Sequence, residues 1–81
     1  MNKKEAKEKT IWYQIDKALR KDIEYAVCSG VFSVRYYKLL DFEKYTYALE
    51  NKRRFLELGY TFEKEEITLD DKKDELIIIS W

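Results

Sequence analysis

The chain lacks histidine and proline, and its 81 residues include only one cysteine, one methionine and two glycines. Histidine is the commonest acid–base group near neutral pH, so its absence removes the usual partner of a nucleophilic serine or cysteine. The single cysteine, Cys28, can form neither an internal disulfide nor a zinc-binding cluster. These absences predict a protein that is not an enzyme and that carries no metal or other cofactor.

Long apolar runs are also absent. The run from Leu76 to Ile79 is far shorter than the roughly 20 residues that a helix needs to cross a bilayer. The first 20 residues contain no apolar stretch of signal-peptide length before Ile11. We therefore expect no membrane association and a cytoplasmic location.

The charged residues make up 40% of the chain and sum to a net charge of zero, but their distribution is uneven. Residues 1–21 carry a net charge of +4, and residues 57–81 carry −5. The basic residues near the start alternate with Glu5, Glu8 and Asp16, which is typical of a solvated helix face and not of a nucleic-acid contact surface. Nucleic acid is therefore not the expected partner.

The apolar fraction of 46% and the 13 aromatic residues predict one folded domain covering residues 1–81. Asn2 and Glu5 have capping-box spacing, so a helix is expected from Lys3 until Gly30 ends it. Residues 3–10 carry almost no apolar side chain except Ala6, so the start of the chain, residues 1–10, is expected to project, to fray or to dock on a partner. Further along, one face of the helix forms an apolar stripe: Trp12, Ile15, Leu19, Ile23 and Ala26.

The rest of the chain predicts a strand, a helix and two further strands. Residues 31–38 alternate as a strand does, and Asp41 is a suitable N-cap for a helix that Gly59 ends. Residues 60–69 predict a strand that either contains a bulge near Ile67 or ends early. Residues 70–75 predict a polar connector, and residues 76–81 the last strand. The apolar stripe expected on the second helix is Phe42, Tyr45, Leu49 and Leu56.

This order predicts a two-layer α+β fold, αβαββ, with a three-stranded mixed sheet and two helices on one face. A right-handed crossover leaves the first two strands parallel. The last strand, apolar on both faces, belongs in the middle. The open face then carries either Ile77, Ile79 and Trp81, or Leu76, Ile78 and Ser80 if the register is flipped. We expect a homo-oligomer that buries this face or the sheet edges, with the interface residues Ile77, Ile79, Trp81 and Trp12.

Candidate ligand-binding residues are Arg35, Tyr37, Arg53 and Arg54. Arginine and tyrosine contribute strongly to protein interfaces, and they also bind phosphates and stack on bases. The carboxylates between Glu65 and Glu75 lie in a turn or at a strand edge, where solvation is the more common role.

The segments LELGYTFEKEEITL and ELIIISW, between Leu56 and Trp81, resemble a pattern found in small proteins of bacteriophages and prophages of Gram-positive bacteria. This resemblance implies an accessory protein that acts in the host cytoplasm. It implies a non-enzymatic role against host defence, as an oligomer that sequesters a small anionic ligand such as a nucleotide immune signal. The alternative is a stoichiometric inhibitor that binds a host defence enzyme through its aromatic surface. The resemblance assigns no functional residues.

Overall fold

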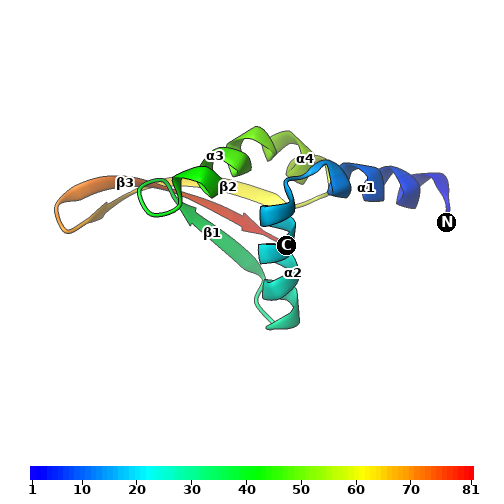
Figure 1. Ribbon diagram of the computed structural model, residues 1–81, viewed down its shortest axis with the longest axis horizontal. Helices are drawn as coiled ribbons and strands as arrows, with labels where there is room; N and C mark the ends of the chain where they lie inside the picture. The colour runs from blue at the N-terminus through cyan, green and yellow to red at the C-terminus, as the bar shows by residue number, and fades with distance from the viewer.

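The computed structural model describes all 81 residues as four helices and three strands, so the predicted α+β fold is confirmed. In chain order the elements are α1 (Lys3–Gln14), α2 (Lys17–Cys28), β1 (Ser33–Tyr37), α3 (Phe42–Glu50), α4 (Lys52–Glu57), β2 (Thr61–Leu69) and β3 (Lys72–Ser80). The molecule is elongated, 51 × 25 × 19 Å, with α1 projecting at one end and the β2–β3 hairpin at the other (Figure 1).

The three strands form one sheet in the order β1-β3-β2, as the apolar character of the last strand predicts. Both pairings are antiparallel, so the expectation of a mixed sheet is wrong. β1 and β2 do run parallel to each other, but β3 lies between them and pairs with both.

The helices pack on one face of this sheet. The sheet contributes Tyr36, Ile77 and Ile79 to the core, and all three point to the same side because the register alternates side chains between the faces. The helices contribute the remaining core residues: Ile15, which links α1 and α2, with Leu19, Ile23, Tyr45, Ala48 and Phe55.

The predicted first helix is divided into α1 and α2 at Ile15 and Asp16. Ile15 adopts an extended conformation (φ −71°, ψ 143°), and the Asp16 side chain accepts a hydrogen bond from the N–H of Ala18 at 2.9 Å. Asp16 therefore begins a new helix as its N-cap. Most of the predicted stripe is nevertheless buried, because α2 keeps Leu19, Ile23 and Ala26 on its core face.

The predicted second helix is likewise divided, at Asn51, into α3 and α4. Its core side carries Tyr45, Ala48 and Phe55. Asn51 is buried, and its Nδ2 donates to the carbonyl of Tyr47 at 2.8 Å. Three residues of the predicted stripe, Phe42, Leu49 and Leu56, are exposed, so that part of the prediction is wrong. The small side chain of Ala48 faces the core where the prediction placed Leu49.

Gly30 and Gly59 end α2 and α4 with positive φ angles of 74° and 86°. After Gly59, the N–H of Tyr60 donates to the carbonyl of Phe55 at 3.0 Å, and the two rings lie 5.5 Å apart. These are the hydrogen bond and the apolar contact of a Schellman turn, as predicted.

The β2–β3 hairpin is tighter and longer than predicted. Asp70 and Asp71, with φ of 49° and 64°, form a two-residue turn between the paired residues Leu69 and Lys72. The expected six-residue connector is wrong, because residues 72–75 belong to β3. The expected bulge or early end of this strand is also wrong, because the register runs without interruption from Thr61 to Leu69. Ile67 and Leu69 lie on the sheet face that carries Leu76, whereas Phe62, opposite Ile79, lies on the other face. The apolar side chains of β2 therefore change face along the strand without an extra residue.

Candidate functional site

The predicted interface residues Ile77 and Ile79 are not on an open surface. Both are fully buried beneath the helices, so their assignment to an oligomer interface is wrong. The flipped register is the correct one, and the face without helices carries Leu76, Ile78 and Ser80. Leu76 is only 5% exposed, because it lies on the central strand between the flanking strands' side chains. The bare apolar stripe that motivated assembly through this face is therefore absent.

The predicted interface residues Trp12 and Trp81 belong to an aromatic cluster centred on Tyr60. Trp12 stacks on Tyr60 at a ring distance of 6.4 Å, and Trp81 lies 5.9 Å from the same ring. The cluster joins α1 to the C-terminal end of the sheet. Trp81 remains 37% exposed, so its role at an interface stays a prediction.

The four candidate ligand-binding residues do not converge within one chain. Arg35 and Tyr37 lie opposite Ile78 and Leu76, on the sheet face without helices. Arg53 and Arg54 lie on α4, in the helical layer on the other side of the sheet. Arg53 pairs with Glu57 at 3.4 Å, and Arg54 donates to the side chain of Asn51 at 2.9 Å.

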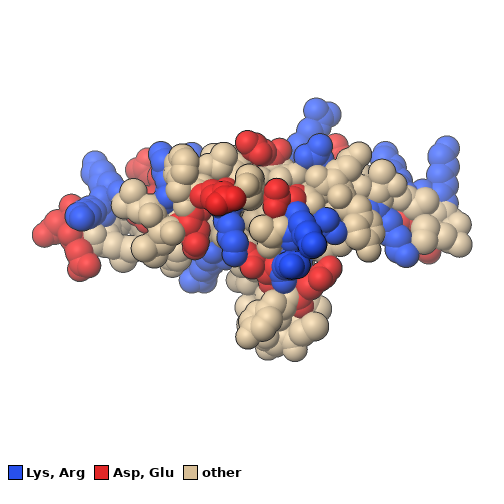
Figure 2. Space-filling view, in the orientation of Figure 1, with Lys and Arg blue, Asp and Glu red and all other residues tan.

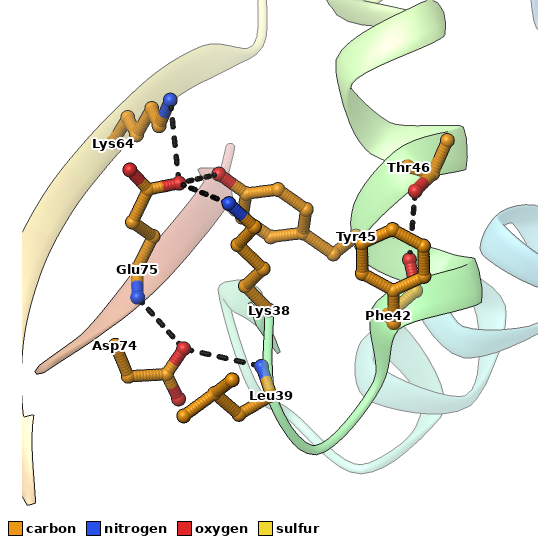
Figure 3. A network of polar contacts seen from close by, with 8 residues as sticks. All are labelled: Lys38, Leu39, Phe42, Tyr45, Thr46, Lys64, Asp74 and Glu75. Atoms are coloured by element: carbon orange, nitrogen blue, oxygen red, sulfur yellow. Dashed lines mark hydrogen bonds and ion pairs between the residues drawn. The ribbon is translucent and has the colours of Figure 1, made fainter. Parts of the chain in front are cut away.

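A polar network around Glu75 joins β2, β3 and the turn that follows β1 to the helical layer (Figure 3). The Tyr45 hydroxyl of α3 donates to a Glu75 carboxylate oxygen at 2.6 Å, and the ammonium groups of Lys38 and Lys64 lie 3.7 and 3.6 Å from the same oxygen. The hydrogen bond from Tyr45, assisted by both lysines, holds the pKa of Glu75 below its ordinary value of 4.5. Burial and the same hydrogen bond raise the pKa of Tyr45.

This electrostatic setting favours a structural role for the network. A catalytic general acid needs a carboxyl group whose pKa is raised toward neutrality, whereas the pKa of Glu75 is shifted in the opposite direction. Glu75 therefore stays ionised and ties the hairpin to α3.

The neighbouring Asp74 fixes the loop between β1 and α3. It is almost fully buried, and its Oδ1 accepts hydrogen bonds from the N–H groups of Leu39 at 3.1 Å and Glu75 at 2.7 Å (Figure 3). Although the backbone is held, the side chains of Leu39 and Leu40 are 62% and 74% exposed. Two large apolar side chains are thus presented to solvent from an anchored loop.

These leucines line a groove against the hairpin, which we call the leucine groove. It has a volume of about 450 Å³, and its lining residues are Leu39, Leu40, Leu69, Asp70, Lys72 and Asp74. A second groove of about 470 Å³ adjoins it across Leu39 and Asp74. The sequence prediction did not include this site. Its signal is the pair Leu39-Leu40, which belongs to neither a strand nor a helix stripe.

A second exposed apolar surface lies at the connection between α2 and β1. Residues 25–34, which we call the uncharged knob, contain no charged side chain in a chain that is 40% charged. Tyr25 and Phe32 are 77% and 71% exposed. Figure 2 shows this lobe, at the lower end of α2, as a largely uncharged protrusion.

No cluster of three or more side chains of the metal-binding types is present. None of the helices combines the length and apolar character needed to span a membrane.

In comparisons with known proteins, the chain matches no protein family, no curated protein and no solved structure. The resemblance to phage proteins therefore stays a prediction.

Proposed function

We propose that this chain is a non-enzymatic, phage-encoded protein that counters host defence in the host cytoplasm by binding a protein partner through the leucine groove. The observation that carries this proposal is the exposure of Leu39 and Leu40 on a loop that Asp74 anchors. Because the backbone of this loop is already anchored, the loop loses little conformational entropy when its side chains are bound, which favours affinity.

The chemistry of the groove suits a protein segment as its ligand. Leu39, Leu40 and Leu69 supply an apolar floor, while Asp70 and Lys72 supply a charged rim. An apolar centre with a polar rim is the usual anatomy of a protein interface. We expect the partner to insert one or two large apolar side chains, with polar groups around them.

Sequestration of a small anionic ligand, the leading prediction from the sequence, finds less support. Arg35 and Tyr37 lie on the opposite side of the sheet from Arg53 and Arg54, so a site using all four needs more than one copy of the chain. Calorimetry with a panel of nucleotides, comparing the wild type with Arg35→Ala and Arg53→Ala, tests this alternative. Tight binding that either substitution weakens at least about tenfold would favour it over protein binding.

The decisive experiment compares Leu40→Asp with Leu56→Asp. Both leucines are exposed, but Leu56 lies on α4, outside the groove. The wild type and Leu56→Asp should retain the same protein, in a one-to-one ratio, from lysate of a Gram-positive host. Loss of an apolar anchor should weaken that complex by about thirtyfold or more in Leu40→Asp. Equal retention by both variants would contradict the proposed site.

Homo-oligomerisation remains part of this proposal. The expected burial of Ile77 and Ile79 between copies is excluded, but the uncharged knob and the sheet edges remain available.

A further inference from the structure

The two edges of the sheet differ in how they are protected against pairing with another strand. β1 and β2 are both edge strands. Along β2, residues 63–66 are four consecutive exposed charged residues, which is a common protection against edge-to-edge association. β1 contains only one charged residue, Arg35, and its first two residues, Ser33 and Val34, belong to the uncharged knob. The β1 edge therefore lacks the protection that β2 has.

The backbone of β1 shows which groups remain free. The N–H of Trp81 donates to the carbonyl of Phe32, and the N–H of Lys38 donates to the carbonyl of Glu75. In an antiparallel pair the bonded residues alternate, so the even-numbered residues of β1 face β3. The N–H and C=O groups of Ser33 and Arg35 consequently point outward, where no strand lies.

We propose that a second copy of this chain pairs antiparallel with β1 across a two-fold axis, joining the two sheets into one of six strands. This inference rests on the proposed self-association and not on the leucine groove. A second copy suits the β1 edge because Arg35 is the only charged residue that each copy brings from β1, so like-charge repulsion is far weaker there than it would be along β2.

The structure selects one register for this pairing. If Ser33 lies opposite Arg35 of the second copy, all the outward groups of both residues are satisfied and Val34 faces its own counterpart. Moving the register in one direction requires the N–H of Val31, which already donates to Ala26 at 2.9 Å. Moving it in the other direction places Arg35 opposite Arg35 and requires the carbonyl of Tyr37, which already accepts from Asp41 at 2.8 Å. The Ser33–Arg35 register avoids both conflicts.

The same register gives the exposed ring of Phe32 a binding site. Phe32 would lie opposite Tyr36 of the second copy, on the face that carries the helices. Beside Tyr36, a groove of about 310 Å³ runs between α2 and β1. Its other apolar lining residues are Tyr25, Ala26, Val31 and Val34, and its polar ones are Asp22, Ser29 and Arg35. The ring of each copy can enter the groove of the other.

The available area sets the expected affinity. Tyr25 and Phe32 together offer roughly 300 Å² per copy, which is less than half of the ~800 Å² per partner in an interface of standard size. The paired strand edges must supply much of the remaining buried area. We therefore expect a dissociation constant on the order of 10–100 μM.

Sedimentation velocity from about 1 μM to about 1 mM tests this pairing, because the range brackets the expected constant. The wild type should change from monomer to dimer. Ser33→Pro removes an outward N–H without removing a bond to β3, and it should abolish the dimer. The matched control Glu66→Pro makes the same change at the β2 edge, where the residue also faces outward, and should dimerise normally. Phe32→Lys leaves the backbone intact and should weaken the dimer at least tenfold.

Amide hydrogen exchange provides an independent readout. The exchange of Ser33 and Arg35 should slow as the concentration rises, while that of Lys64 and Glu66 should not change. A wild type that stays monomeric up to about 1 mM would overturn the inference, as would a dimer that survives Ser33→Pro or is lost in Glu66→Pro. Leu40→Asp should dimerise like the wild type, so a failure of partner binding is distinguishable from a failure of this pairing.

Discussion

At the scale of single residues, the hydrogen bond between Tyr45 and Glu75 joins α3 to the central strand β3. Tyr45 is buried in the helical layer, and its hydroxyl reaches a carboxylate that two lysines from the flanking segments also approach. A buried aromatic ring whose polar end finds a partner contributes apolar burial without leaving an unsatisfied hydroxyl.

Tyr45→Phe should therefore lower the melting temperature by about 5 °C, because the ring remains and only a hydrogen bond to a charged acceptor is lost. Tyr47→Phe is the matched control, since Tyr47 donates to Glu43 at 2.7 Å on an exposed helix surface. Thermal unfolding followed by circular dichroism measures both. A larger effect in Tyr47→Phe would show that the Glu75 network does not hold the hairpin.

Glu75 also predicts a dependence of stability on pH. Because the pKa of Glu75 is lower in the folded protein than its ordinary value of 4.5, its stabilisation is present above pH 4.5 and lost as the pH falls below it. Glu75→Gln should consequently lose less stability than the wild type between neutral pH and the acid side of that value. Urea unfolding at a series of pH values measures the difference, and parallel curves for the two proteins would exclude this contribution.

At the scale of elements, the turn of the β2–β3 hairpin is formed by two aspartates, which are not the residues that favour its backbone conformation most. Asp70 and Asp71 both adopt positive φ, the backbone of a type I′ turn, for which Asn-Gly is the preferred pair. The turn lies beyond the helical layer and has no core contact that would compensate for this backbone cost.

The double substitution Asp70→Asn with Asp71→Gly should stabilise the protein by about 1 kcal/mol, because glycine adopts positive φ without a steric penalty. Asp71→Ala serves as the opposite control and should destabilise it. Chemical denaturation measures the free energy of unfolding for all three proteins. A stabilisation by alanine equal to that by glycine would point to relief of charge repulsion and not to the backbone.

At the scale of the whole molecule, the elongated shape separates the two oppositely charged regions. The basic first half of α1 projects at one end, and the acidic hairpin projects at the other (Figure 1). The two regions therefore cannot neutralise each other within one chain. Contact between the acidic hairpin and the basic start of α1 therefore requires two copies of the chain.

Residues 1–10 are all exposed, so removing residues 1–8 should change the melting temperature by less than about 2 °C. Trp12→Ala, just beyond this segment, should lower it by about 10 °C because it removes the ring that stacks on Tyr60. Thermal melts of both variants check the contrast. A large loss on truncation would show that the start of α1 has a stabilising role that its exposure does not reveal.

The candidate site was only partly predictable. The chemistry of arginine and tyrosine side chains predicts that they lie at interfaces. Composition does not indicate, however, that Arg35 and Arg53 lie on opposite sides of the sheet. The leucine groove is made by residues about 30 positions apart, Leu39 and Leu69, and local patterns carry no information about that distance.

The sequence by itself determined the element types, the two glycine caps and the order of the sheet. Local backbone preferences decide where Gly30 and Gly59 end helices, and a strand that is apolar on both faces is most stable in the centre. The tertiary structure decided the rest. Four consecutive apolar residues, Leu76 to Ile79, fit either phase of the pleat equally well. Only packing against α2, α3 and α4, themselves reoriented by the breaks at Asp16 and Asn51, directs Ile77 and Ile79 inward.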